Sequence, residues 1–178
     1  MTQRSSRPER LLIPAQIALA TLLAYVIGFS FTSLFPGYLP KIGALWSAIS
    51  AVVVTQLTRE DTRKSASLRV LGTAIGASTS AVYLSLLPFH PIGMAAAIFA
   101  TGVICGAINV PSHGRLAAIT VLVVMVTASL SPALNPGLNA LLRFAESCIG
   151  TAVAVLVVLL WPQTVSYTHL TLPTKRIV

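Results

Sequence analysis

Long apolar stretches separated by short connections dominate the pattern of this chain. Six such stretches lie at about 11–35, 42–58, 66–87, 91–109, 115–133 and 140–161. A helix that spans a bilayer needs roughly 17 to 25 mostly apolar residues, and each stretch can meet that length. The connections carry prolines and glycines that end helices, as in FPGYLP, LPFHP, NVPSHG and SPALNPG. The pattern predicts an all-α membrane protein with a six-helix transmembrane bundle over residues 11–162.

Composition supports a membrane location. The 178 residues are 55% hydrophobic and 9% charged, whereas a soluble domain carries about 25% charged residues. The net charge of +8 raises the question of nucleic acid. However, the basic residues lie before or between the apolar stretches and form no basic face interleaved with aromatic residues. We therefore expect the lipid bilayer, and no nucleic acid, as a partner.

The basic residues also predict an orientation. If the N-terminus is cytoplasmic, eight of them lie inside and two outside: Arg4, Arg7, Arg10, Arg59, Arg63, Lys64, Arg69 and Arg115 against Lys41 and Arg143. Cytoplasmic connections carry an excess of Lys and Arg. We therefore expect residues 1–10 to form a basic cytoplasmic N-terminus, with both ends of the bundle on that side. Trp46 and Trp161, near the ends of stretches, are expected at the membrane interface.

An internal repeat relates the two halves of the chain. LRVLGTAIGASTSAVYLSLLP (68–88) aligns without gaps with LRFAESCIGTAVAVLVVLLWP (142–162). The informative matches are Arg69 with Arg143, Gly76 with Gly150 and Pro88 with Pro162. Each copy would hold three helices, an odd number, so the copies would cross the membrane in opposite directions. We therefore expect two inverted three-helix repeats, an arrangement common in transporters.

Glu146 is the acidic residue that lies well inside a predicted span, in the sixth stretch. An ionisable residue at that depth is expensive and often lies on the path of an ion or substrate. Arg143, three residues earlier, lies on the same side of the helix and can pair with it. Two interpretations follow: a pair neutralised near the outer interface, or a proton-coupling carboxylate with Arg143 as an anion contact. In the repeat, Gly72 stands at the position of Glu146.

Arg69 lies about one turn into the third stretch, on the predicted cytoplasmic side. Its long side chain could snorkel to phosphate head groups. Alternatively, its planar guanidinium could attract a carboxylate that enters from the cytoplasm, because the two groups pair through parallel hydrogen bonds. Gln56 could line a path or pack between helices. The candidates for a substrate or proton pathway are therefore Glu146, Arg143, Arg69 and Gln56.

Small residues in the repeat predict close helix packing. Gly72 and Gly76 form a G-x-x-x-G pattern that Ser80 extends along one helix face. Small side chains let two helix backbones approach closely within a membrane. Gly150 is the repeat partner of Gly76, and Thr73 could pack or hydrogen-bond across helices, as could Ser147. We therefore assign Gly72, Thr73, Gly76, Ser80 and Gly150 to helix packing.

The other residues that could carry chemistry have ordinary explanations. Glu60 and Asp61 are expected to pair in solvent within the basic inner connection. Loop positions and buried apolar positions account for the histidines and cysteines: His90, His113, Cys105 and Cys148. The sequence shows no nucleophile–base arrangement, phosphate loop or metal-ligand cluster. We therefore expect no enzyme activity, no cofactor and no metal.

The end of the sequence differs in character from the rest. Back-translation of VSYTHL (165–170) can reproduce the transposase end sequence used to prepare sequencing libraries. We therefore expect residues 165–178 to be a non-native, adapter-derived tail, which would make the chain part of a longer protein.

The segment LWSAISAVVVTQLTREDTRKSASLRVLGTAIGA (45–77) resembles the fusaric acid resistance and aromatic acid exporter family of inner-membrane proteins. The family pattern is a Trp-led helix ending in VVVxQ, a basic loop and R-x-x-G-T-x-x-G. Here it falls on Trp46, Val52, Val53, Val54, Gln56, Arg69, Gly72, Thr73 and Gly76. Leu57 departs from it, since many members have proline there. LLRFAESCIGTAVAVLVVLLWP (141–162) resembles the sixth helix of the family.

The resemblance implies a multi-pass protein of the bacterial inner membrane. The implied function is proton-driven efflux of aromatic or other small carboxylic acids. Family members often continue into a cytoplasmic domain and a second bundle. An alternative stays open: a non-transporting membrane anchor of a larger protein, or a module that forms homo-oligomers through its glycine-rich faces.

Overall fold

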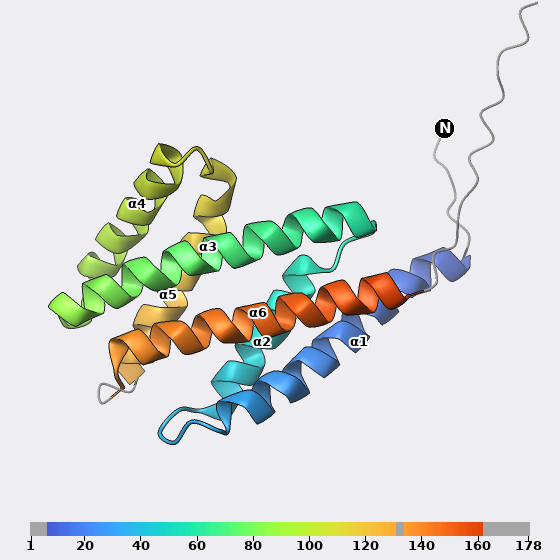
Figure 1. Ribbon diagram of the computed structural model, residues 1–178, viewed down its shortest axis with the longest axis horizontal. Coiled ribbons are helices and arrows are strands. Elements are labelled where there is room, and N and C mark those ends of the chain that lie inside the picture. Colours follow the sequence, from blue (N-terminus) through green and yellow to red (C-terminus); the bar gives the residue numbers. More distant parts are fainter. Residues whose placement is uncertain (1–6, 131–133, 162–178) are drawn as a thin grey trace, which may run out of the picture.

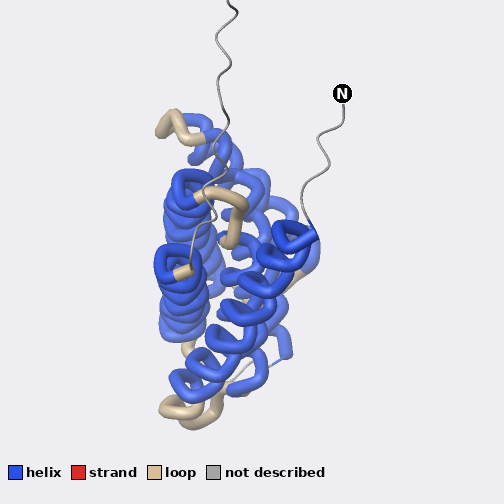
Figure 2. Tube along the Cα trace, turned by 90° about the vertical axis from the view of Figure 1, so that its right-hand side faces the viewer, coloured by secondary structure: helices blue, strands red, loops and turns tan. Residues whose placement is uncertain are grey.

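The computed structural model describes residues 7–130 and 134–161, with side chains from residue 11 onward. These residues form α1 (Arg7–Thr32), α2 (Pro40–Val54), α3 (Arg59–Leu86), α4 (Pro91–Ala107), the short 3-10 helix η1 (Pro111–His113), α5 (Gly114–Leu130) and α6 (Pro136–Leu160). No strand occurs in the part of the chain that the structure describes (Figure 2). The predicted all-α fold is confirmed. Residues 1–6 and the predicted non-native tail, 165–178, lie outside the described residues.

Local sequence explains where several helices begin. Pro40, Pro91 and Pro136 are the first residues of α2, α4 and α6, where a proline's missing N–H leaves no hydrogen bond unmade. The side chain of Asn135 caps α6 by accepting a hydrogen bond from the backbone N–H of Leu138 at 3.0 Å. Helix α4 begins at the expected residue, whereas α2 and α6 begin before the stretches expected from 42 and 140, because the proline starts the helix.

The start of α3 differs from the sequence-based expectation, which places residues 59–65 in a loop. The helix begins at Arg59 because Thr58 caps it, accepting a hydrogen bond from the backbone N–H of Asp61 at 3.0 Å. Two acidic residues in the first turn stabilise that helix end. Glu60 pairs with Lys64 one turn on, at 2.7 Å and exposed to solvent. The polar segment is therefore the beginning of the third helix.

Helices α3 and α6 lie side by side and run in opposite directions through the middle of the molecule (Figure 1). On one side, α1 and α2 pack against each other and both contact α6. On the other side, α5 packs against α3, and α4 packs mainly against α5. The α3–α6 pair is thus in contact with both flanking pairs, and it is the place where distant parts of the sequence meet.

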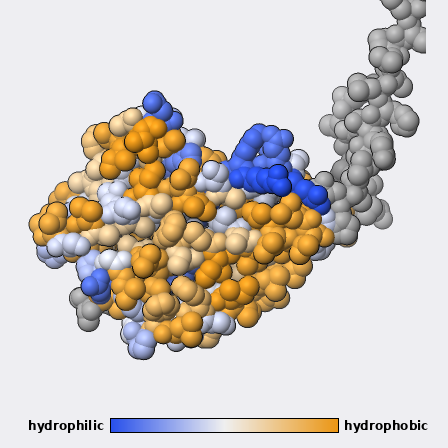
Figure 3. Space-filling model, viewed as in Figure 1, coloured by the Kyte–Doolittle hydropathy of each residue, from blue (hydrophilic) through white to orange (hydrophobic). Residues whose placement is uncertain are grey.

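The outer surface is largely apolar, as Figure 3 shows for one face, with hydrophilic atoms gathered over the start of α3. Three helical segments are long and apolar enough to cross a membrane: Leu11–Thr32, Pro111–Leu130 and Pro136–Leu160. Helices α2 and α4 are apolar but shorter. Large apolar side chains such as Leu22, Phe99 and Leu156 are exposed. These features indicate a membrane location.

Candidate functional site

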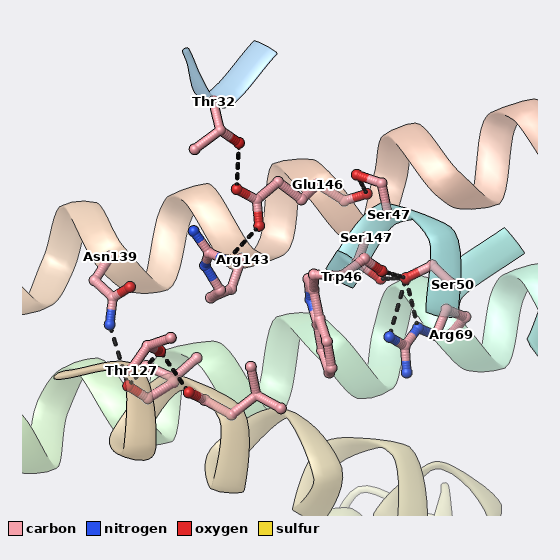
Figure 4. Close-up of polar contacts among 12 residues, drawn as sticks. Thr32, Trp46, Ser47, Ser50, Arg69, Thr127, Asn139, Arg143, Glu146 and Ser147 are labelled. Carbon is pink, nitrogen blue, oxygen red and sulfur yellow. Dashed lines mark hydrogen bonds and ion pairs between the residues drawn. The ribbon is translucent and has the colours of Figure 1, made fainter. Parts of the chain in front are cut away.

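Three charged side chains lie buried where α2, α3 and α6 meet. The exposed fractions are 0% for Arg69, 2% for Arg143 and 0% for Glu146. Burial of a charge inside a protein is costly unless an opposite charge or hydrogen bonds compensate for it. Two guanidinium groups and one carboxylate leave this interior with an excess of positive charge. We call these three residues, with the side chains that contact them, the buried charged cluster (Figure 4).

Glu146 and Arg143 form the ion pair that the sequence predicts. Arg143 Nη1 lies 2.9 Å from Glu146 Oε2, and the other carboxylate oxygen accepts a hydrogen bond from the Thr32 hydroxyl at 2.7 Å. Gly43 of α2 leaves room for this arrangement, because a Cβ there would overlap the Thr32 hydroxyl and Glu146 Oε1. Both members of the ion pair therefore belong to α6, while Thr32 of α1 and Gly43 of α2 contact the Glu146 carboxylate.

The ion pair uses only part of the hydrogen-bonding capacity of Arg143. Its Nε has no hydrogen-bond partner, and its Nη1 approaches only Glu146 Oε2, at 2.9 Å. The contact is thus a single close approach of charges and not the two-armed pairing that arginine and carboxylate can form.

Tyr38, in the connection between α1 and α2, lies close enough to Arg143 for the two groups to interact electrostatically. Burial raises the pKa of the Tyr38 phenol, while the positive charge of Arg143 acts to lower it. A phenol is uncharged at neutral pH, and the raised pKa extends that to higher pH. Tyr38 therefore adds no second negative charge near Arg143.

A row of hydroxyl groups connects the two ends of the cluster. Ser47 of α2 donates to the backbone carbonyl of Glu146 at 3.0 Å. Ser50 donates to the Ser147 hydroxyl at 3.2 Å, and the hydroxyls of Ser147 and Thr73 lie 3.1 Å apart. Thr73 was expected to pack or to hydrogen-bond across helices, and it does the latter. It pairs with the residue that the repeat places opposite it.

Arg69, at the other end of the cluster, has no carboxylate partner among the described residues. Its Nε and Nη2 donate to the Ser50 hydroxyl at 3.1 and 2.9 Å. Its guanidinium carbon lies 4.5 Å from the centre of the Trp46 ring, a cation–π contact. Its Nη1 is buried without a hydrogen-bond partner, as is Trp46 Nε1.

Two expectations about these residues are wrong. Arg69 does not snorkel to the membrane surface, because α2 covers it and its side chain is held by Ser50 and Trp46. Trp46 is buried beneath that guanidinium, and its ring is not exposed on the outer surface as an interface residue would be. The position of a residue near the end of an apolar stretch does not reveal which neighbouring helix will cover it.

The glycines of the repeat make close helix contacts. A Cβ at Gly76 would overlap the Ala117 carbonyl of α5, and a Cβ at Gly150 would overlap the Ser47 carbonyl of α2. A Cβ at Gly72 would lie 2.9 Å from Leu116 Cβ. Ser80 is buried and donates to the Gly76 carbonyl at 2.8 Å. These positions are thus places where helices approach closely.

Gln56, the fourth pathway candidate, lies away from the buried charged cluster. It is exposed, and its side chain donates to the Val53 carbonyl at 3.1 Å. His113, expected to be an ordinary loop residue, is buried in η1, and its Nδ1 lies 3.3 Å from the Ser112 hydroxyl.

Sequence analysis did not single out three members of the cluster, Thr32, Ser47 and Ser50, and it did not place Trp46 in the interior. One signal was available, because Ser47 and Ser50 stand three residues apart on an otherwise apolar helix and therefore share a face. For Thr32, at the end of its helix, no comparable signal exists.

A crevice of about 280 Å³ opens between α3 and α6, separate from the charged side chains. Small and apolar residues line it: Ala74, Ala77, Ser78, Ala81, Gly137, Ala140, Leu141 and Phe144. The charged side chains themselves are at most 2% exposed, so they are enclosed in this conformation. The cluster combines two cations, one carboxylate and a row of hydroxyl groups.

A family model described as fusaric acid resistance protein-like matches residues 17–157, which include α2 to α5 and most of α1 and α6. No curated protein and no solved structure matches the chain.

Proposed function

Because the chain belongs to the fusaric acid resistance protein-like family, we propose that it exports aromatic or other small carboxylic acids in exchange for protons. Family membership indicates a membrane transporter-like function in general. The substrate class and the proton coupling are the parts that we propose.

The uncompensated charge of Arg69 is the observation that carries the proposal. A buried guanidinium whose polar neighbour is one serine hydroxyl costs free energy that a bound anion would offset. Carboxylates suit guanidinium best, since both groups are planar and pair through two hydrogen bonds.

Glu146 is the proposed proton carrier. It is the buried carboxylate of the described chain, and its partners are an arginine and a threonine hydroxyl. Protonation would remove its charge and release Arg143 to contact a substrate anion. A change of protonation would thus alter the number of positive charges open to the substrate, which links proton entry to acid exit.

We further propose that the six helices span the bacterial inner membrane as two inverted three-helix halves, with a cytoplasmic N-terminus. The hydrogen bond between Thr73 and Ser147, which the repeat pairs, supports this architecture. The glycines support it too, because Gly76 meets α5 as its repeat partner Gly150 meets α2. In both contacts the glycine lies against a backbone carbonyl.

The alternative, a non-transporting anchor or oligomerisation module, is not favoured. A module of that kind needs packing surfaces but no buried arginine without a counter-ion, since such a group lowers stability.

Growth in the presence of acid tests the proposal. Cells without other acid exporters, expressing this chain, should tolerate several-fold more fusaric acid or benzoate than cells with an empty vector. Arg69→Gln should abolish the gain, whereas Arg63→Gln, at an exposed position of the same helix, should preserve it. Equal tolerance in all strains, at equal membrane levels of the protein, would refute the export function.

Proton coupling needs a second measurement. Liposomes containing the protein and loaded with labelled benzoate should release it faster when the outside is made acidic, and a protonophore should remove the difference. If the rate of benzoate release does not depend on the proton gradient, the protein transports benzoate but does not exchange it for protons.

A further inference from the structure

The two buried arginines hold equivalent positions in the repeat but have different surroundings. Arg69 lies four residues before Thr73, and Arg143 lies four residues before Ser147. Helices α3 and α6 are antiparallel, and the Thr73 and Ser147 hydroxyls are in contact. Because four helical residues rise roughly 6 Å, the backbone of Arg69 lies that far along the axis on one side of the contact and the backbone of Arg143 on the other. The interior therefore holds two cationic positions, one toward each end of the bundle.

Only one of the two positions has a carboxylate of its own. Three residues after Arg143 stands Glu146, whereas three residues after Arg69 stands Gly72. The helices that face these two positions differ correspondingly. Gly43 of α2 leaves space for the Glu146 side chain, whereas Leu116 of α5 fills the space beside Gly72. The chain thus neutralises Arg143 itself and leaves Arg69 without a counter-ion.

We propose that Glu146 is a tethered anion that occupies the outer of two carboxylate sites, and that the carboxylate of a substrate binds the inner site at Arg69 and competes with Glu146 for Arg143. This inference rests on the proposed function and adds how the site works. Substrate would pass from one arginine to the other along the hydroxyls of Ser50, Thr73 and Ser147, which lie between them.

The geometry of the ion pair suits such an exchange. Glu146 holds Arg143 through one nitrogen–oxygen contact, at Nη1, and Arg143 Nε has no hydrogen-bond partner. An incoming carboxylate could pair with the guanidinium through two parallel hydrogen bonds, which Glu146 does not. Thr32 donates to the other carboxylate oxygen of Glu146, so the displaced carboxyl group would keep a partner.

Binding stoichiometry tests this inference. The purified full-length chain, in detergent micelles at pH 7.5, is titrated with benzoate, with benzamide as the neutral control. We expect one benzoate per chain for the wild type and at least tenfold weaker binding for Arg69→Gln. Glu146→Gln should bind two benzoates, because it frees Arg143, and Arg69→Gln/Glu146→Gln should bind one.

The outcomes separate this inference from the proposed function. A wild-type chain that binds no benzoate contradicts both. Alternatively, the wild type binds one benzoate through Arg69 while Glu146→Gln also binds only one. That result would refute the role of Glu146 as a tethered anion and would not contradict the proposed transport function.

A measurement on the wild type covers the case in which Glu146→Gln does not fold. Benzenesulfonate stays ionised at every pH used, so its stoichiometry reports the protein alone. The side chains that face Glu146 are Arg143 and Thr32, and the Ser47 hydroxyl donates to the Glu146 backbone carbonyl. Tyr38 lies near Arg143. Acidification that protonates Glu146 should raise the stoichiometry from one to two. A constant value down to pH 5, with the fold intact by circular dichroism, would refute the inference.

Discussion

The hydroxyl groups of Thr73 on α3 and Ser147 on α6 lie 3.1 Å apart, and the two residues stand 74 positions apart in the sequence. That spacing is the offset of the internal repeat, so two equivalent residues are in contact with each other. Equivalent residues that touch each other must lie beside the axis that relates the two halves. That axis would therefore pass between Thr73 and Ser147, at the centre of the α3–α6 pair. The buried charges lie about one turn to each side of it.

A disulfide should form across this contact. In a variant with Thr73→Cys and Ser147→Cys, and with the native cysteines replaced by alanine, mild oxidation should join α3 and α6. The link would be detected by mass spectrometry of peptides from the oxidised and reduced protein. Thr79→Cys with Ser147→Cys is the control, because Thr79 bonds to its own helix and is two turns away. Equal cross-linking of both variants would contradict the contact.

Breaking the Arg143–Glu146 pair from one side should destabilise the protein. Arg143→Gln leaves a buried carboxylate with only the Thr32 hydroxyl, and the expected loss is about 3–5 kcal/mol in the free energy of unfolding. The double variant Arg143→Gln/Glu146→Gln should recover much of that loss, because no isolated charge remains. Denaturation in detergent micelles measures both. Additive effects of the two single changes would show that the residues do not interact.

Arg69 should behave in the opposite way. Arg69→Met removes a buried charge that has no ionic partner and retains an apolar side chain over Trp46. We expect the free energy of unfolding to stay constant or to rise by about 1–4 kcal/mol, while acid tolerance is lost. A stability loss as large as that of Arg143→Gln would mean that Arg69 is a structural residue.

Glycine positions offer a steric test of the helix contacts. Gly150→Ala should lower the free energy of unfolding by about 1–3 kcal/mol, because the new methyl group would overlap the Ser47 carbonyl. Gly102→Ala is the matched control on α4, where a Cβ meets nothing within 4 Å. There the change should be neutral or stabilising by up to about 1 kcal/mol, since alanine favours helix. Thermal unfolding of the two variants should differ in sign or clearly in size.

The sequence by itself determined what depends on local order along the chain. Apolar stretches bounded by prolines predict the helices and their approximate limits, and the Arg143–Glu146 pair follows because residues three apart share a helix face. The glycine pattern predicts close packing in the same way. The polar start of α3 was missed, since charged residues after a capping threonine resemble a loop.

Only the tertiary structure decided what surrounds the charges. Thr32 reaches Glu146 across 114 residues, and Ser50 and Trp46 reach Arg69 from another helix. Such contacts depend on how helices cross, and crossing is set by the shapes of their whole surfaces and not by local spacing. For the same reason Arg69, which could have extended to the lipid head groups, lies enclosed, and its unmatched charge defines the candidate site.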